Sequence, residues 1–327
     1  MRQRRCTAGT GAEQEGPILR RSIRVAAILA AICMVLTTGW AGTAARAQAP
    51  GTALLLSSSP STYKLDPTTG QLSVLVANGE DAVISPDRTR VAYVRDLDRD
   101  LCLYRDPLGS CWAFDDLLTA ELSGAGEQAV AHTADMVHRS SPDWSPKGSR
   151  ILFTWWTFDE GNGLAWVRPD GSGLETLELY AGRGRFSPDG RKVAYVRDGN
   201  LKLMNLAGRR TRLLTSDASS DGYTPDWSPD GRQITYTGSE GLYLLDVKTS
   251  QARNLAAGWT APVSYPSTAV FSPDGTQIAF AAADMSAYPE GVAVMRIYIV
   301  NVAGGEPRPI ADASGELTDW VQLSPTG

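Results

Sequence analysis

Hydrophobic and polar positions alternate in short runs along most of the chain, and the runs recur. A large apolar residue precedes a Ser-Pro pair at six places: Ser85, Ser145, Ser187, Ser228, Ser272 and Ser324. After five of these pairs a β-branched residue is followed two positions later by an aromatic residue, as in Ile234-Thr-Tyr236. Since successive side chains of a strand point to opposite faces, this alternation predicts β-strands.

A tight turn is expected between the first and second strands of each unit. The full sequence Ser-Pro-Asp-Gly occurs at three of the six places, while Arg88 replaces the glycine in the first copy and Lys147 replaces the aspartate in the second. Proline fixes φ and Asp-Gly supports a turn, so this segment predicts a hairpin. A third and a fourth strand follow, and in the first unit we expect Leu103–Asp106 to be the third strand.

Four antiparallel strands in about 40–50 residues are typical of a propeller blade. The units resemble the TolB-like, WD-like propeller family, whose repeats join an apolar residue, Ser-Pro-Asp-Gly and a strand such as Ile-Ala-Phe. The segments Trp227–Tyr236 and Phe271–Phe280 match this pattern closely. The resemblance covers nearly all of residues 52–327 and implies an all-β propeller.

The last copy, Asp319–Gly327, contains only a first strand. Near the start of the propeller region, Ala53–Ser57, Thr62–Asp66 and Gln71–Val76 read as a second, third and fourth strand. We expect them to complete a sixth blade with the C-terminal strand, which closes the ring and leaves no unpaired sheet edge. A truncated reading frame is the alternative explanation of the last copy.

Two intervals between Ser-Pro pairs are longer than the others. We place the extra residues at Leu118–Arg139 in the first and at Asp284–Gly291 in the second. Insertions on a repeat scaffold form loops, often on the binding face.

The N-terminal segment has the features of a secretory signal peptide. Arginines precede the apolar run Val25–Leu36, and Ala45-Arg-Ala47 offers a cleavage site. The run is shorter than the roughly 20 residues that span a bilayer. We therefore expect a signal peptide over residues 1–47, a single propeller domain over residues 48–327, and a secreted or periplasmic protein. An uncleaved membrane anchor is the alternative.

Export would place the chain in an oxidising compartment. Cys102 and Cys111 remain after cleavage, and they flank a Pro-Leu-Gly-Ser turn. They are candidates for a disulfide that clips a hairpin, with a pair of buried free thiols as the alternative.

Composition and charge narrow the choice of partner. The 327 residues are 43% hydrophobic and 20% charged, as in an ordinary soluble protein, with a formal net charge of −5. Cleavage would remove arginines and make the chain more acidic, which argues against nucleic acid and anionic lipid as partners. We expect a monomer with no stable membrane span after cleavage.

The sequence does not favour catalysis. TolB-like propellers also occur in prolyl-oligopeptidase-type peptidases, but this chain has no Gly-x-Ser-x-Gly elbow, and its two histidines, His132 and His138, lie near no nucleophile motif. His132, Asp135 and His138 offer metal-type ligands, yet we interpret them as polar loop residues. Asp96–Asp100 resembles the start of a calcium loop without its glycine and glutamate. We therefore assign no catalytic residue, metal or cofactor.

Binding candidates follow from position in the ring. The loops that enter the innermost strands should converge on the mouth of the central channel. The charged, histidine and aromatic residues that they contain are His138, Arg139, Asp143, Arg183, Arg185, Tyr223, Asp226, Tyr265 and Asp319. The alternative for each aspartate is a local role as acceptor for backbone N–H groups.

Tryptophans divide into two kinds. Trp144 and Trp227 recur with the Ser-Pro motif, so we expect them in the core. Trp155 and Trp156 are adjacent on a strand and should point to opposite faces. One of them is a candidate surface aromatic for a sugar or peptide, while packing between blades is the alternative for both.

Together these features predict an exported, non-catalytic propeller that binds a protein or peptide of the cell envelope or the extracellular space. The alternative function is a metal-dependent, carbohydrate- or lactone-active propeller enzyme that uses the central channel.

Overall fold

The computed structural model describes most of the propeller region. The described residues are 51–96, 104–105, 111–112, 115–131, 137–157, 161–216, 218, 224–261, 263–264, 266–286 and 294–323. The predicted signal peptide lies outside them, as do Cys102, His132, Asp135, Tyr223 and Tyr265, so the pairing of Cys102 with Cys111 is not described.

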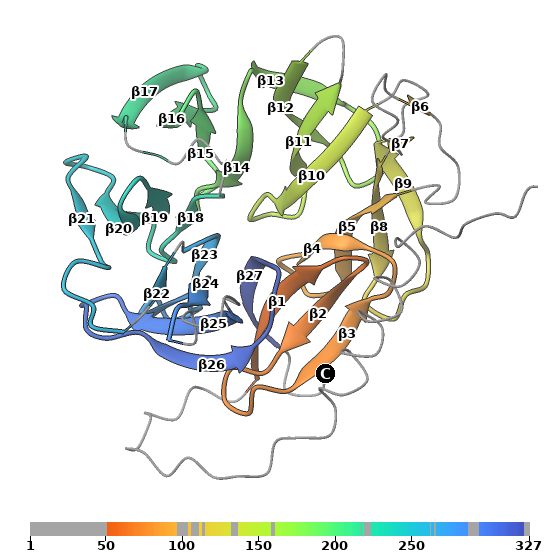
Figure 1. The fold of residues 1–327 in the computed structure, drawn as a ribbon. Coiled ribbons are helices and arrows are strands. Elements are labelled where there is room, and N and C mark those ends of the chain that lie inside the picture. The colour runs from red at the N-terminus through yellow and green to blue at the C-terminus, as the bar shows by residue number, and fades with distance from the viewer. Residues whose placement is uncertain are drawn as a thin grey trace, which may run out of the picture. The chain divides into compact units, whose positions relative to one another are not determined.

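Six antiparallel sheets stand around a central axis, and all secondary structure of the described residues is strand (Figure 1). From the axis outward, blade 1 contains β27 (Glu316–Gln322), β1 (Thr52–Ser58), β2 (Ser61–Leu65) and β3 (Leu72–Val76). Blade 2 contains β4 (Glu80–Ile84), β5 (Arg90–Asp96), β8 (Asp115–Glu121) and β9 (Gln128–Ala131). Blade 3 contains β10 (Val137–Trp144), β11 (Ile151–Thr157), β12 (Gly161–Val167) and β13 (Glu175–Leu179).

The second half of the ring repeats the arrangement. Blade 4 contains β14 (Gly182–Phe186), β15 (Lys192–Arg197), β16 (Asn200–Asn205) and β17 (Arg210–Thr215). Blade 5 contains β18 (Asp226–Trp227), β19 (Gln233–Gly238), β20 (Gly241–Asp246) and β21 (Ala252–Asn254). Blade 6 has an innermost strand in two pieces, β22 (Val263–Ser264) and β23 (Ala269–Phe271), followed by β24 (Gln277–Asp284), β25 (Val294–Asn301) and β26 (Arg308–Asp312).

The two ends of the propeller region close the ring, as predicted. In blade 1, β1 pairs antiparallel with β27, and Leu54 lies opposite Trp320. The innermost strands of successive blades contact one another all the way round, including β23 with β27 and β27 with β4. The prediction of six four-stranded blades with a composite closing blade is confirmed.

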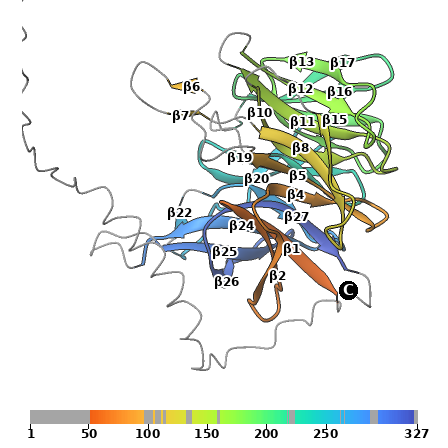
Figure 2. The same cartoon turned by 90° about the vertical axis from the view of Figure 1, so that its right-hand side faces the viewer.

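One predicted strand is wrong. The third strand of blade 2 is β8, which pairs with β5, whereas Tyr104–Arg105 (β6) pairs only with Cys111–Trp112 (β7) in a small hairpin. Leu117 and Leu118 of β8 are buried and complete the blade, which the more polar 103–106 segment cannot do. The extra residues of this blade therefore lie between β5 and β8, and not at 118–139. In Figure 2 the β6–β7 hairpin stands off one face of the ring.

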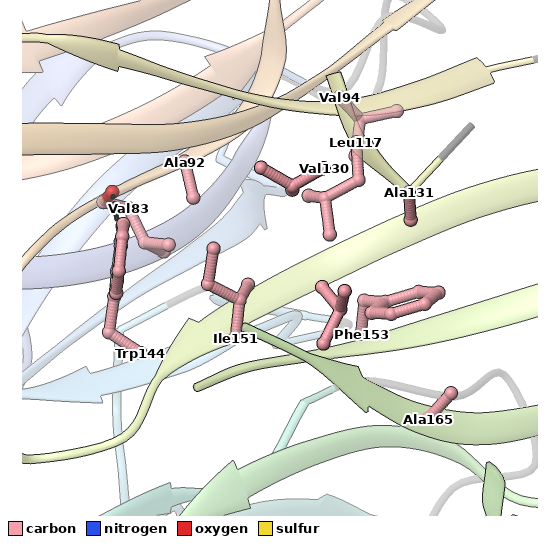
Figure 3. Close-up of a cluster of buried hydrophobic side chains, with 11 residues drawn as sticks. Val83, Ala92, Val94, Leu117, Val130, Ala131, Trp144, Ile151, Phe153 and Ala165 are labelled. Carbon is pink, nitrogen blue, oxygen red and sulfur yellow. Dashed lines mark hydrogen bonds between the residues drawn. The ribbon is translucent and has the colours of Figure 1, made fainter. Parts of the chain in front are cut away.

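The hydrophobic core lies between neighbouring blades. Figure 3 shows one such cluster, in which Val83 and Leu117 of blade 2 face Trp144, Ile151 and Phe153 of blade 3. The motif tryptophans are buried, as predicted from their recurrence, with exposures of 7% for Trp144 and 6% for Trp227. Burial of each such aromatic side chain stabilises the joint between two blades by roughly 2–3 kcal/mol.

The Ser-Pro-Asp-Gly turn is held by its own side chains. Ser228 Oγ donates to Asp230 Oδ1 at 2.7 Å and accepts the Gln233 N–H at 2.9 Å. Gly231 adopts a φ of +69°, which suits glycine. We call the face with these turns the lower face, and the face at which the innermost strands begin the upper face.

Candidate functional site

One position of each innermost strand builds the centre of the ring. In blades 2 to 6 it is the residue just before the apolar residue that precedes Ser-Pro, and in blade 1 it is Asp319, which precedes the buried Trp320. Around the ring from blade 1 to blade 6, this axial layer consists of Asp319, Val83, Asp143, Arg185, Asp226 and Val270.

Arg185 crosses the axis of the ring. Its side chain is buried, and Nη1 donates to the Pro142 carbonyl at 3.2 Å and to Asp143 Oδ1 at 3.3 Å, both in blade 3. Its Nη2 donates to the carbonyl of Thr318 in blade 1, which is opposite blade 4 in a ring of six. One guanidinium thus ties three blades together.

Two aspartates of the layer connect their blade to the next one. Asp143 Oδ2 accepts the Phe186 N–H at 2.7 Å, and Asp226 Oδ2 accepts the Phe271 N–H at 2.7 Å. These aspartates therefore do accept backbone N–H groups, but the donors belong to the next blade and not to the local turn. Asp319 differs, because its Oδ1 accepts the N–H of its own neighbour Trp320 at 2.7 Å.

Tryptophan side chains close two further joints. The indole N–H of Trp144 donates to the Val83 carbonyl, and that of Trp227 donates to the Arg185 carbonyl, both at 3.2 Å. Indole and carboxylate joints alternate from blade 2 to blade 6, because the Asp-Trp pairs of blades 3 and 5 each supply both types. Within the described ranges, the Asp-Trp pair of blade 1 supplies neither bond.

Charge in the axial layer is unbalanced, with three carboxylates around one guanidinium. Burial raises the pKa of Asp143 to about 6 and that of Asp226 to about 7, although Arg185 opposes both shifts. Burial also raises the pKa of Asp319. Burial alone would lower the pKa of Arg185, but the three carboxylates outweigh it and the pKa is raised.

A second set of charged residues lies toward the upper face. Arg183 Nη1 donates to Glu316 Oε2 at 2.6 Å, and this pair also joins blade 4 to blade 1 across the axis. His138 Nδ1 lies 3.0 Å from Asp115 Oδ2, and Arg139 donates to the Asp115 carbonyl. These groups are partly exposed, apart from the buried Arg139.

The predicted channel-mouth residues therefore occupy two levels. Arg185 and the three aspartates lie within the ring, while His138, Arg139 and Arg183 lie nearer the upper face. No local signal in the sequence marks Glu316, Thr318 or Asp115, because the partner of each lies in another blade.

The adjacent tryptophans of β11 have different neighbours. Trp155 packs against the core between blades 2 and 3, and a Cβ at Gly163 would lie 2.8 Å from its ring. Trp156 contacts the His138 ring at a centroid distance of 5.2 Å. Each is partly buried, so a role in surface recognition stays a prediction.

The described ranges contain no group of three or more His, Cys, Asp or Glu side chains arranged to hold a metal ion. They also contain no helix with the length and hydrophobicity needed to cross a bilayer.

Comparison with known families supports the propeller fold that the sequence repeat and the closed ring of blades indicate. Residues 88–297, more than half of the chain, match the family model described as the TolB beta propeller domain. The chain belongs to the TolB beta-propeller family. A comparison with curated proteins found no match.

Solved structures share the fold of this TolB-family propeller. The putative TolB from Agrobacterium tumefaciens has a TM-score of 0.59 at 16% identity, covering 82% of this chain and 92% of that one. The puromycin-hydrolysing peptidase of Mycobacterium tuberculosis has a TM-score of 0.55 at 16% identity, covering 86% of this chain and 45% of the peptidase. Oligogalacturonate lyase from Vibrio parahaemolyticus has a TM-score of 0.52 at 15% identity, covering 78% and 72%.

Proposed function

We propose that this TolB-family propeller is a non-catalytic scaffold that binds a protein or peptide on its upper face, and that it acts outside the cytoplasm after export. The Arg183–Glu316 pair carries the proposal. It joins opposite blades at 2.6 Å, and the two side chains are 25% and 40% exposed. It therefore presents both signs of charge near the axis, where a partner can reach them.

The rigidity of this surface supports the proposal. Below the pair, Arg185 ties blade 4 to blades 3 and 1, so the two upper charges stand on a framework of fixed geometry. A binding surface that is already ordered loses little conformational entropy when a partner docks. Opposite charges on it favour a partner with complementary polar groups over an apolar one.

Charge reversal at this pair tests the proposal. Partner capture from an extract of the source organism would be quantified by mass spectrometry for the full chain, R183E, E316R and the double variant R183E/E316R. The double variant keeps the ion pair across the axis but exchanges its charges. We expect both single variants and the double variant to lose the captured partner by about tenfold or more.

The double variant separates binding from ring stability. If it captures the partner as well as the wild type does, the pair serves only the ring and the upper-face proposal fails. R232E is the matched control, because Arg232 is an exposed arginine in a lower-face turn, and we expect it to capture normally. Thermal unfolding of every variant shows whether a loss of capture comes from misfolding.

The alternative of a metal-dependent enzyme has its own test. Elemental analysis of the purified chain measures tightly held divalent ions directly. One such ion per chain would favour the enzyme and contradict the non-catalytic proposal.

A further inference from the structure

A pocket of about 260 Å³ lies in the lower half of the ring, where blade 1 meets blades 2 and 3. The lining residues that matter here are Asp319 and Trp320 of β27, Val83 of β4, Asp143 and Trp144 of β10, and Arg88 of the first Ser-Pro turn. This volume is close to the lower end of the range for small-molecule sites, so it suits a ligand of about amino-acid size.

The pocket lies at the contact between blades 1 and 2, where a hydrogen bond found between other blades is missing among the described residues. At the two equivalent joints, Asp143 and Asp226 each use Oδ2 to accept an N–H of the next blade. Asp319 bonds only the N–H of Trp320 within the described part of the chain, and it does so through Oδ1. Asp319 Oδ2 therefore has capacity for a donor from outside the chain.

The indole of the same blade is also unusual. Trp144 and Trp227 each donate their indole N–H to the preceding blade. Trp320 is 4% exposed, and its indole N–H has no acceptor among the residues that the structure describes. The indole bond would join blade 1 to blade 6, whereas the missing bond of Asp319 would join it to blade 2, on the side of the pocket.

The charge of the axial layer indicates which donor fits. Three carboxylates face one guanidinium, and Arg185 already donates to Asp143 and to two carbonyls. A carboxylate that is largely removed from water gains from each further hydrogen-bond donor. A cationic donor at Asp319 and Asp143 would balance this charge, and the lining also includes Trp144 and Trp320, a residue type that attracts ammonium groups.

Arg88 adds a cation on the other side of the pocket. Its side chain is exposed, and it occupies the turn position that is glycine in the four later described copies of the motif. A guanidinium there suits a carboxylate. The pocket therefore combines an acidic inner part with a basic rim.

We propose that this pocket binds a small zwitterionic amine of the α-amino acid class, with its ammonium group on Asp319 and Asp143 and its carboxylate on Arg88. This site goes beyond the proposed partner surface, because it lies toward the opposite face and takes a small molecule. Failure of either proposal leaves the other standing.

Isothermal titration calorimetry on the full chain tests the proposal with three related probes. L-norleucine carries both charged groups, pentylamine carries the ammonium group alone, and hexanoate carries the carboxylate alone. We expect norleucine to bind, pentylamine to bind about tenfold more weakly, and hexanoate to show no binding. D319N should weaken norleucine binding by at least tenfold, and D143N should weaken it as well.

The layer supplies a matched control in Asp226, which is not part of the pocket lining. D226N should bind norleucine as the wild type does, while R88G should remove the difference between norleucine and pentylamine. Thermal unfolding confirms that each variant is folded. The proposal is overturned if norleucine does not bind at 10 mM, if D319N binds it normally, or if calcium binds in a D319N-sensitive way while the amines do not.

Discussion

Arg88 adopts a backbone conformation that suits glycine. Its φ is +60°, close to the +65° to +70° of the glycines at the same place in the later turns. A residue with a Cβ pays about 1–2 kcal/mol for this left-handed conformation. The turn tolerates the cost because the N–H of Arg88 still donates to the Ser85 carbonyl at 2.8 Å.

We expect R88G to stabilise the fold by roughly 0.5–1 kcal/mol, since glycine relieves the strain but gives the unfolded chain more freedom. Urea unfolding followed by circular dichroism measures the difference. R191G is the control, because Arg191 lies just after the turn glycine of another copy and has no positive φ. Its replacement should destabilise the protein, and a loss of stability in R88G of the same size would contradict the strain argument.

Joints between blades are built from single hydrogen bonds to the innermost strands. The indole of Trp227 reaches the Arg185 carbonyl, whereas the equally buried indole of Trp320 has no such acceptor in the described ranges. These two tryptophans occupy the same place in their blades. Their comparison isolates the hydrogen bond from the burial of the ring.

We expect W227F to lose about 1 kcal/mol more stability than W320F. Both substitutions remove similar apolar volume, but only W227F leaves a buried carbonyl without its donor. Chemical denaturation of the two variants gives the difference directly. Equal losses would show that packing alone closes the joint.

Most strands and turns could be predicted from the sequence repeat. The prediction was wrong in blade 2, where the sequence departs from the repeat. Trp144 and Trp227 could be placed in the core because they recur with Ser-Pro. The third strand of blade 2 could not be found by extending the repeat, since the inserted segment separates β5 from β8. The partners of Arg183 and Arg185 across the axis lie in the opposite blade of the closed ring, so no local sequence pattern predicts them.

At the scale of the whole molecule, the ring encloses more negative charge than Arg185 neutralises. Asp143 and Asp226 have pKa values of about 6 and about 7, raised first by burial, with Asp319 as a further negative neighbour. Arg183 and Glu316 are already paired with each other nearer the upper face. The folded state therefore holds protons at neutral pH that the unfolded chain releases.

This difference sets the sign of the pH dependence. A group whose pKa is raised by folding stabilises the native state below that pKa, and the benefit is lost as the pH rises through it. Between pH 6 and pH 8, Asp226 and Asp143 together should cost about 2 kcal/mol of stability. The turn aspartates act in the opposite direction, but their pKa values are below the ordinary range, so they titrate outside this window.

We therefore expect the protein to unfold at a lower temperature at pH 8 than at pH 6, by several degrees. Scanning calorimetry across this range measures the slope, and D226N should reduce it because an amide takes up no proton. D230N is the matched control, since hydrogen bonding to Ser228 lowers the pKa of Asp230 in an exposed turn, and its slope should equal that of the wild type. A slope that D226N leaves unchanged, or a stability that rises from pH 6 to pH 8, would show that Arg185 and the neighbouring N–H groups already compensate the carboxylates of the ring.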